Sequence, residues 1–383
     1  MAGVSRNLTG RDGVFRYLAL ALLKTRALDI KRRTELGGQG QWLSRLLGGR
    51  QIAQRFARWL DQRLMNQGFY TDLFESYSPD LIFAADIQNE YDVRLVHEAK
   101  ARGIAVVGMV RSWDNLAAKG LIRAWPDLLL ANNKIVKADV VRLNRFPEEK
   151  VLVVGVPHYD RYLSEKRSGR EDFFRRIGAD PQKRLILYVP TGNRYVPSGH
   201  QLDRDVIEMI TLNLPPDTQL LVRLPPTDEV NLGGLPASNL VYFDRPRTRY
   251  FDIRNTELDR DADRHLADTL YHADLLIAGP STMAVDAALF DKPIILIGFD
   301  GYADRPYYES ILRYYDYEHW RPVFRSRGVR LVRSSEELQN WISVYLNNPA
   351  LDAGYRRKMV GEQSFKLDGQ SSQRVVRALA EYL

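Results

Sequence analysis

Short runs of aliphatic residues alternate with longer amphipathic segments along most of this chain, and this alternation constrains the fold more than any other feature. The runs lie at 80–85, 104–110, 127–131, 150–155, 184–189, 219–224, 239–243, 273–278, 292–297 and 329–332. Most are apolar without alternation, as expected of strands buried on both faces of a parallel sheet. Helices are predicted between them, for example at 90–102, and at the end of the chain at 335–347, 352–366 and 370–382. The sequence therefore predicts an α/β fold with parallel sheets.

The length of the chain predicts two domains of this kind. A single hydrophobic core rarely grows beyond about 250–300 residues, and this chain has 383. The polar, charged stretch 161–183 is the best candidate for a linker. We therefore expect two Rossmann-like, doubly wound domains that face a cleft, in residues 1–165 and 166–350. We expect residues 351–383 to form C-terminal helices.

Positive charge is concentrated at the N-terminus. The net charge is +7, but residues 1–63 alone carry a net +9, from 13 basic and 4 acidic side chains. Residues 51–70 are amphipathic, with Ile52, Phe56, Trp59 and Leu64 on one face. Two interpretations stay open, because this face would suit either an anionic membrane or the docking of a helix on a sheet. No nucleic-acid-binding motif accompanies the charge, so we expect no nucleic-acid partner.

The composition excludes several kinds of site. The chain has no cysteine and six histidines, which excludes disulfide scaffolds and thiol nucleophiles and disfavours a His-rich metal site. The acidic run Asp259–Asp263 is predicted to begin a helix rather than to bind metal. No apolar run approaches the ~20 residues of a membrane span. We expect a cytoplasmic protein that is peripheral on the inner face of the cell membrane if the N-terminus binds lipid.

The most specific segment is His272–Gly298, in which a buried strand ends at Gly279-Pro280 and a helix follows. Ser281 or Thr282 is predicted to cap that helix, whose first N–H groups and hydroxyls would suit a pyrophosphate. Asp286 follows about one turn later, where a carboxylate could hold ribose hydroxyls. The alternative is that Ser281 and Thr282 only cap the helix and that Asp286 only complements its dipole.

This segment resembles the donor-nucleotide element of GT-B glycosyltransferases, and most of all that of the CDP-glycerol glycerophosphotransferase and surface-carbohydrate branch. Leu187–Arg194, which contains Thr191, is similar to the family's "ILYaPTwR", and Leu221–Pro226 stands in place of its "lirlHP". The resemblance implies a nucleotide-binding C-terminal domain in which Arg194 and Arg223 contact phosphate. It also implies that no cofactor or metal is needed, and that the C-terminal helices cross back to the first domain. The family's second histidine is Pro225 here.

The loop Val110–Gly120 follows a predicted strand of the first domain and resembles the family's "WHGtplKxxG". The resemblance places Trp113 on the family Trp, Asp114 on the His that activates the acceptor, and Lys119 on the family Lys. An Asp can deprotonate a hydroxyl if it is partly desolvated. The alternative is that Asp114 or Asn115 caps the helix that follows.

The aromatic stretch Pro306–Trp320 is dense in tyrosine, and two interpretations stay open. It could line the donor site, with Glu318 and His319 available for hydrogen bonds. Alternatively, its tyrosines pack a helix against the sheet.

We therefore expect a GT-B transferase that moves a sugar from a nucleotide-activated donor to a glycan or lipid-linked acceptor in surface polysaccharide synthesis. Asp114 and Lys119 would act on the acceptor, while Thr191, Arg194, Arg223, Ser281, Thr282 and Asp286 would bind the donor. Glycosyl transfer is preferred to CDP-glycerol-type polyol-phosphate transfer because Asp114 and Pro225 replace the two family histidines. A UDP-sugar 2-epimerase and a scaffold without catalysis are also compatible with such a fold.

Overall fold

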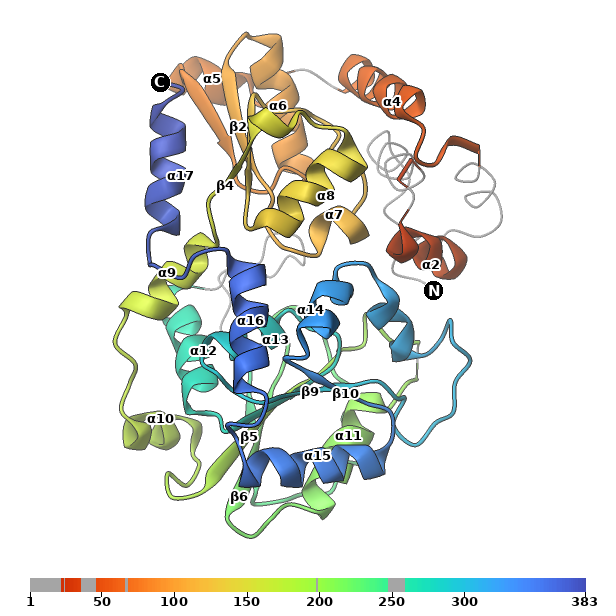
Figure 1. The fold of residues 1–383 in the computed structure, drawn as a ribbon, viewed down its shortest axis with the longest axis vertical. Helices are drawn as coiled ribbons and strands as arrows, with labels where there is room; N and C mark the ends of the chain where they lie inside the picture. Colours follow the sequence, from red (N-terminus) through yellow and green to blue (C-terminus); the bar gives the residue numbers. More distant parts are fainter. Residues whose placement is uncertain (1–21, 24, 36–45, 66–67, 198, 247–258) are drawn as a thin grey trace. The chain divides into compact units, whose positions relative to one another are not determined.

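The computed structural model describes the chain except for residues 1–21, 24, 36–45, 66–67, 198 and 247–258. The described residues form two compact units, drawn in Figure 1. Unit 1 contains the described residues up to Ser164 together with Asp316–His319 and Gly361–Leu383. Unit 2 contains Glu165–Tyr315 and Trp320–Val360. The N-terminal basic residues up to position 21 lie outside the described part.

Unit 1 is built on a four-stranded parallel sheet in the order β1-β2-β3-β4. The strands are β1 (Leu81–Ala84), β2 (Ala105–Met109), β3 (Leu128–Ala131) and β4 (Val151–Val153). The helices are α2 (Arg26–Glu35), α4 (Gln51–Leu64), α5 (Thr71–Tyr77), α6 (Glu90–Ala101), α7 (Asn115–Ala118), α8 (Lys134–Asn144), the 3₁₀ helix η2 (Glu148–Lys150), α9 (Pro157–Ser164) and α17 (Ser371–Ala380). Helix α16 (Ala353–Ser364) spans the boundary between the units.

The last helix of the chain completes the core of unit 1. Because side chains alternate along a strand, Val106 of β2 belongs to the main core cluster, whereas Val107 and Met109 face the opposite side. On that side they pack with Val375 and Ala378 of α17. Figure 1 shows α17 beside this sheet. The second face of the sheet is therefore buried by residues that lie more than 200 positions further along the chain.

The carboxylate of Asp160 holds the N-terminus of α17. It accepts hydrogen bonds from Ser371 N (3.0 Å) and Ser372 N (2.6 Å). Burial alone would raise the pKa of Asp160, but these backbone bonds outweigh it and lower the pKa. The approach is close at Gly155, whose φ is +93° and where a Cβ would overlap the Ser371 hydroxyl.

We expect Asp160→Ala to lower the free energy of unfolding by about 1–2 kcal/mol, the usual loss when a helix cap is removed. Urea unfolding followed by circular dichroism would measure it. Glu75→Ala, at an exposed site of the same unit, is the matched control and should change stability by less than about 0.5 kcal/mol. Equal values for the two variants would contradict the anchoring role of Asp160.

Unit 2 is built on a six-stranded parallel sheet in the order β10-β9-β8-β5-β6-β7. The strands are β5 (Arg184–Val189), β6 (Thr218–Arg223), β7 (Val241–Asp244), β8 (Leu275–Ala278), β9 (Ile294–Ile297) and β10 (Arg330–Val332). The helices are α10 (Arg170–Ile177), α11 (Leu202–Leu212), α12 (Arg260–His272), α13 (Met283–Leu289), the 3₁₀ helix η3 (Ile311–Asp316), α14 (Trp320–Ser326) and α15 (Ser335–Asn347).

Both faces of the unit 2 sheet are covered. Ile186 and Tyr188 of β5 pack into a core with α11 and α15. The alternate residues Leu185 and Leu187 are also fully buried, and α12 packs against β5. The predicted fold class, two parallel α/β domains, is therefore confirmed, and each predicted strand is present within two or three residues at its ends.

The stretch 161–183, predicted as a linker, is largely helical. The unit boundary does fall in it, between Ser164 and Glu165. However, α9 ends there, and α10 buries Phe173 and Phe174 in unit 2. The many charged residues of the stretch concealed this apolar pair at helical spacing.

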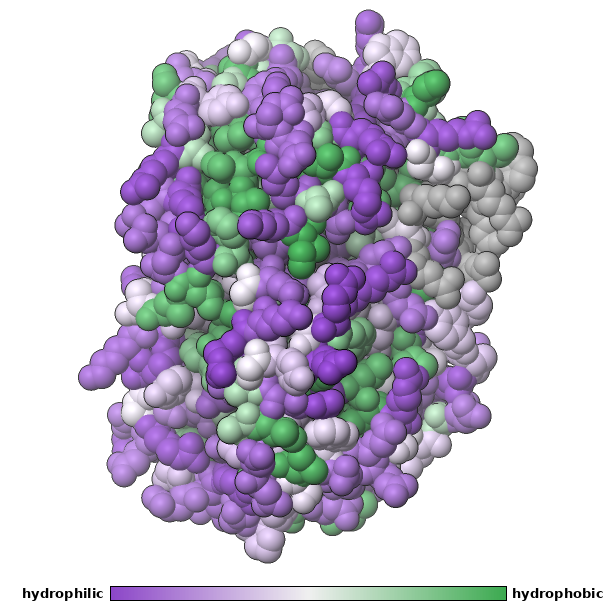
Figure 2. Space-filling view, in the orientation of Figure 1, coloured by the Kyte–Doolittle hydropathy of each residue, from purple (hydrophilic) through white to green (hydrophobic). Residues whose placement is uncertain are grey.

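Helix α4 packs on unit 1 through a face that carries Gln54, Asp61 and the small residues Ala53 and Ala57. Gln54 and Asp61 are buried, and Asp61 forms a bidentate pair with Arg123 (2.9 and 2.8 Å). Ile52, Phe56 and Trp59 are instead 84%, 59% and 51% exposed. Figure 2 shows hydrophobic side chains at the surface over α4, at the upper right, beside hydrophilic ones. The interpretation of this apolar face as the docking face is therefore wrong.

Candidate functional site

Two of the predicted donor-binding segments meet at the carboxyl end of the unit 2 sheet. Strands β5 and β8 are parallel neighbours, with Val189 opposite Ala278, so the chain leaves both strands at the same edge. Thr191 follows β5 and Gly279 follows β8. A Cβ on Gly279 would overlap the Thr191 hydroxyl, which shows how closely the two loops approach. The structure thus brings Thr191 and Ser281 to one place.

The predicted capping role at α13 belongs to Ser281. Its hydroxyl accepts a hydrogen bond from Met283 N (3.3 Å). Thr282 occupies the N-cap position, but its side chain makes no capping bond and is exposed at the same edge. Asp286 lies in the first turn of α13 and is half-buried. These three residues stand as a polar group at the start of a helix, as the sequence predicted.

A buried carboxylate shapes the loop after β5. Asp203, on the first turn of α11, accepts hydrogen bonds from Thr191 N (2.8 Å), Gly192 N (3.0 Å) and Tyr188 Oη (2.6 Å). Gly192 adopts φ +83°, where an L side chain would be strained. Burial raises the pKa of Asp203 despite these bonds. The N–H groups of this loop are thus directed at Asp203, which leaves side chains to face a donor.

Arg194 joins the loop after β5 to the loop after β6. Its backbone N–H donates to Asp228 Oδ2 (3.0 Å), and its guanidinium donates to the Thr227 carbonyl (2.9 Å). The side chain is nevertheless exposed. Arg194 therefore places a positive charge at the same carboxyl edge of the sheet, where its guanidinium bonds to a neutral carbonyl.

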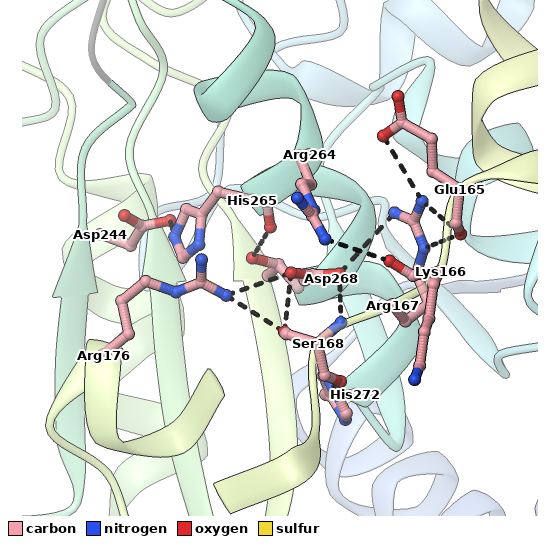
Figure 3. Close-up of polar contacts among 11 residues, drawn as sticks. Glu165, Lys166, Arg167, Ser168, Arg176, Asp244, Arg264, His265, Asp268 and His272 are labelled. Atoms are coloured by element: carbon pink, nitrogen blue, oxygen red, sulfur yellow. Dashed lines mark hydrogen bonds and ion pairs between the residues drawn. The ribbon is translucent and has the colours of Figure 1, made fainter. Parts of the chain in front are cut away.

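Arg223 differs from the expected phosphate ligand. It is 4% exposed and forms an ion pair with Asp244 of β7, which also binds His265 Nε2 (3.1 Å). Burial would raise the pKa of Asp244, but His265 and Arg223 outweigh it and lower the pKa. Figure 3 shows His265 facing Asp244. Because its charge is compensated inside unit 2, we leave Arg223 out of the donor site.

The same figure shows a second buried carboxylate, Asp268 of α12, at the entry of the chain into unit 2. Asp268 binds Ser168 Oγ (2.7 Å), Ser168 N (3.2 Å) and Arg176 (3.1 Å). Arg167 approaches the same carboxylate at 3.7 Å. These bonds tie residues 167–168 to α12, and we assign them a structural role.

In unit 1, the loop Val110–Gly120 leaves the carboxyl end of β2, as predicted. Asp114 precedes α7, but its side chain makes no capping hydrogen bond and its backbone is already helical. The alternative that Asp114 serves as a helix cap is thus not what the structure shows. Asp114 is half-buried.

The C-terminal end of α7 is tied to the start of α2. Lys31 Nζ donates to the Ala118 carbonyl (2.7 Å), and Thr25 Oγ1 donates to the Ala117 carbonyl (2.9 Å). Lys119 follows with its side chain exposed. The C-terminal end of the loop is therefore held through its backbone carbonyls, while the Lys119 side chain stays exposed and Asp114 is half-buried.

Asn115 is an unusual member of this loop. It is 1% exposed, and among the described residues neither its Nδ2 nor its Oδ1 has a hydrogen-bond partner. Burying such a group costs about 1–3 kcal/mol. Unfavourable buried groups of this kind are often found in functional loops, and Asn115 is the neighbour of Asp114.

The aromatic stretch 306–320 divides between the two units. Tyr315 is buried in unit 2, where its hydroxyl donates to the Ile297 carbonyl (2.9 Å). Asp316–His319 instead belong to unit 1. There the His319 ring lies edge-on to Trp113 at 5.0 Å, and Glu318 accepts a hydrogen bond from Ala27 N (3.1 Å). The stretch is thus neither a continuous helix on the sheet nor wholly part of a donor site.

His319 is electrostatically linked to the Asp114 loop. Burial lowers the pKa of His319 to about 4, which outweighs the attraction of Asp114; Lys31 lowers it further. The ring is therefore neutral at pH 7. No repeated pattern in the sequence could have paired position 319 with position 114.

The partners of Asp203 could not be predicted from the sequence either, because all of them are backbone or hydroxyl groups.

Within the described residues, no group of three or more His, Asp or Glu side chains is placed to hold a metal ion. No helix in this part of the chain is long and apolar enough to cross a bilayer.

Solved structures with the same fold include the S. aureus MnaA–UDP co-structure, at 12% identity and a TM-score of 0.56 over 97% of this chain and 94% of that chain. Another is a UDP-GlcNAc 2-epimerase from Neisseria meningitidis bound to UDP-GlcNAc, at 14% identity and a TM-score of 0.53 over 86% and 82%. At such identities the likeness shows the fold alone.

Among curated proteins, the UDP-N,N'-diacetylbacillosamine 2-epimerase (hydrolyzing) of Legionella pneumophila is 25% identical over 245 residues. The match covers 60% of this chain and 59% of that protein, so it spans less than two thirds of the relative's length.

A family model covers more of the chain and includes all the donor-edge residues. The model for CDP-glycerol:poly(glycerophosphate) glycerophosphotransferase matches residues 121–381. The match begins just after Asp114 and Lys119, so it does not bear on those two positions. It does cover well over half of the 383 residues. The chain therefore belongs to the CDP-glycerol:poly(glycerophosphate) glycerophosphotransferase family, a family of transferases.

Proposed function

We propose that this protein transfers a polyol phosphate from a nucleotide-activated donor to a hydroxyl of a glycan or lipid-linked acceptor during synthesis of a cell-surface polymer. Family membership carries the proposal. From the sequence alone we expected a sugar to be transferred. We now favour a polyol phosphate, because the family is named for glycerophosphate transfer.

The donor is assigned to the carboxyl edge of the unit 2 sheet. Thr191 and Ser281 stand together there, with Thr282 at the N-cap of α13, Asp286 on its first turn and Arg194 on the adjoining loop. Hydroxyl and guanidinium groups suit the diphosphate. The Asp286 carboxylate suits the ribose hydroxyls. The set needs no metal ion among its ligands, because Arg194 supplies positive charge.

The acceptor is assigned to unit 1, with Asp114 as the base and Lys119 as a nearby cation. The acceptor oxygen attacks the phosphorus that carries the polyol and forms a new P–O bond. The bond from that phosphorus to the bridging oxygen breaks, and a nucleoside monophosphate leaves. The hydroxyl proton passes to the Asp114 carboxylate, so charge and atoms balance.

Glycosyl transfer is a second candidate, favoured by Asp114 and Pro225 at the positions of the two family histidines. In that reaction the acceptor oxygen attacks the anomeric carbon, and the bond from that carbon to the phosphate oxygen breaks, so that a nucleoside-diphosphate sugar releases a nucleoside diphosphate. The leaving group therefore distinguishes the two candidates.

A thermal-shift panel of CDP-, UDP-, GDP- and CMP-linked donors tests the donor site. A donor at 100 times its Kd should stabilise the protein by about 2.7 kcal/mol, and Thr191→Val with Ser281→Ala should reduce the shift. Release of nucleotide in the presence of acceptor then assigns the reaction. With a CDP-, UDP- or GDP-linked donor, release of a monophosphate supports polyol-phosphate transfer and release of a diphosphate supports glycosyl transfer. A CMP-linked sugar releases CMP on glycosyl transfer, so turnover of that donor also supports glycosyl transfer. A free sugar epimer formed without acceptor supports epimerisation. No shift with any donor would overturn the proposal and favour a scaffold.

We further propose that α4 lies on an anionic membrane surface, where lipid-linked acceptors reside. Its outer face combines Phe56 and Trp59, whose rings stack at 5.7 Å, with the exposed Arg55 and Arg63. The acidic residue of the helix, Asp61, is buried against Arg123. The exposed side of α4 is therefore aromatic and cationic, which matches an interfacial helix.

We expect the double variant Arg55→Gln/Arg63→Gln to bind vesicles containing phosphatidylglycerol about 30-fold more weakly than the wild type. Each basic residue near an anionic surface contributes about 1 kcal/mol. Co-sedimentation with vesicles measures the partitioning. Arg321→Gln/Lys358→Gln, at exposed sites of unit 2, is the matched control. Equal binding of both double variants, or binding to neutral vesicles alone, would contradict the proposal.

A further inference from the structure

The turn that follows β6 receives two arginine side chains from opposite directions. Arg194, in the loop after β5, donates from its guanidinium to the Thr227 carbonyl (2.9 Å). Arg245 directly follows β7 and reaches back to the same turn. There its Nη1 donates to the carbonyls of Asp228 (3.4 Å) and Pro225 (3.5 Å). Because Thr227 and Asp228 are adjacent in the chain, both guanidinium groups lie on one turn.

The acidic groups of this turn do not bind either guanidinium. The Asp228 carboxylate accepts the backbone N–H groups of Arg194 (3.0 Å) and Glu229 (2.9 Å), and the Glu229 side chain is exposed. A Cβ on Gly192 would overlap Asp228 Oδ2, so this carboxylate faces the backbone of the loop after β5. Among the described residues, the guanidinium groups of Arg194 and Arg245 bond to carbonyl oxygens and form no ion pair.

Two exposed cations that converge in this way favour an anion at the turn. Like charges held close together repel each other, and an anion that contacts both relieves the repulsion. A bond to a neutral carbonyl orients a guanidinium without compensating its charge. Each guanidinium has five N–H donors, and the turn uses one nitrogen of each, Nη2 of Arg194 and Nη1 of Arg245. The remaining donors suit phosphate oxygens, which guanidinium groups bind through two parallel hydrogen bonds.

The turn lies beside the residues assigned to the donor. Strands β8, β5 and β6 are consecutive neighbours and run parallel, so the chain leaves all three at the same edge of the sheet. Neighbouring strands are about 4.8 Å apart. Thr191 and Ser281, which follow β5 and β8, are therefore separated from the turn by about one or two strand spacings. A diphosphate with its flanking groups, contacted by long arginine side chains, covers a distance of this size.

We infer that Arg194 and Arg245 together bind the diphosphate of the nucleotide donor, with Arg245 as the second cation of the donor site. The inference rests on the proposed function, in which the donor occupies this edge of the unit 2 sheet. It adds a requirement for the substrate. A CDP-, UDP- or GDP-linked donor engages both guanidinium groups, whereas a CMP-linked donor has a single phosphate and engages them only in part.

Binding of a nucleoside, its monophosphate and its diphosphate, measured by calorimetry, isolates the contribution of the phosphates. The series uses the base that the thermal-shift panel selects, for example cytidine, CMP and CDP. Arg245→Gln keeps a hydrogen-bond donor for the turn but removes the charge. We expect it to weaken diphosphate binding roughly 10- to 100-fold, the effect of losing a charge-assisted hydrogen bond. The affinity for the nucleoside should stay within about twofold of the wild type.

Two further variants separate phosphate binding from a structural role. Arg245→Lys keeps the charge but lacks the planar fork, so it should recover part of the lost affinity. Arg175→Gln, on α10 of the same unit with a side chain that is 75% exposed, is the matched control and should bind all three ligands like the wild type. If Arg245 only held the turn, Arg245→Gln would leave the ratio of diphosphate to nucleoside affinity unchanged. That result would overturn the inference.

The binding series needs no turnover, so it distinguishes this inference from the proposed function. If Arg245→Gln loses the phosphate-dependent affinity but no donor is transferred to an acceptor, the proposed function fails while the phosphate site stands. If donors are transferred and Arg245→Gln binds the diphosphate as tightly as the wild type, the phosphate site fails alone. Absence of binding by every nucleotide in the panel would overturn both.

Discussion

Asp114→Ala should lower kcat by 10² to 10⁴-fold while leaving donor affinity within about twofold of the wild type. A positioned general base contributes a rate factor of that size. The residues that we assign to the donor belong to unit 2, whereas Asp114 belongs to unit 1. Initial rates of nucleotide release give kcat, and the donor-induced thermal shift gives the affinity.

The fold should survive this substitution, because the Asp114 side chain makes no capping hydrogen bond to α7. Asp72→Asn, at an exposed position of α5 in the same unit, is the control and should retain full activity. Turnover of Asp114→Ala within tenfold of the wild type would remove Asp114 as the base. It would leave the donor site unaffected.

The largest expected loss of stability follows from Asp244→Ala in unit 2, which should lower the free energy of unfolding by about 3–5 kcal/mol. The substitution removes the Asp244 carboxylate from its ion pair with Arg223, whose side chain is only 5% exposed, and breaking a buried ion pair by removing one partner is costly. It also removes a hydrogen-bond partner of His265. Chemical denaturation measures the loss.

The double variant Asp244→Leu/Arg223→Met provides the matched control for this pair. Removing both charges should recover most of the stability lost in the single variant, because apolar residues of similar volume often replace buried ion pairs at little cost. A single-variant loss below about 1 kcal/mol would show that the pair contributes little.

The same ion pair predicts that the free energy of unfolding decreases at acidic pH. Because His265 and Arg223 lower the pKa of Asp244 in the folded state, the contribution is complete above the ordinary Asp pKa of about 4. It is lost as the pH falls through the lowered value. The difference in unfolding free energy between wild type and Asp244→Ala should therefore shrink below about pH 4. A difference that is constant with pH would contradict this.

The strands were the most predictable part of the fold. A run such as 184–189 is short, apolar at nearly every position and rich in aliphatic residues, which is the pattern expected of a strand buried on both faces. The ends were less predictable, since β4 is three residues long where six were expected. Strand ends depend on pairing with a neighbour, which the run itself does not encode. The helix at 170–177 was missed because its charged residues outnumber its two buried phenylalanines.

The candidate site was partly predictable for a similar reason. Thr191 and Ser281 follow strands, and parallel strands place their carboxyl ends at one edge, so their meeting could be expected. The pairing of Arg223 with Asp244 could not be predicted. It depends on the register of β6 and β7, which places Arg223 opposite Asp244. Asp203 and His319 were hidden as well. The partners of Asp203 are backbone or hydroxyl groups, and Trp113 and Asp114 lie more than 200 positions from His319, so no local pattern marks these contacts.

The alternation of strands and helices thus determined the fold class, because burial on both faces of a parallel sheet imposes a pattern on each strand separately. The sequence also determined that one face of α4 is apolar. Only the tertiary structure decided which face of that helix docks. Gln54 and Asp61 bind groups from distant segments, namely the Leu143 carbonyl and Arg123. These polar contacts turn Ile52 and Phe56 outward, because a helix docks on the face whose partners the rest of the chain provides.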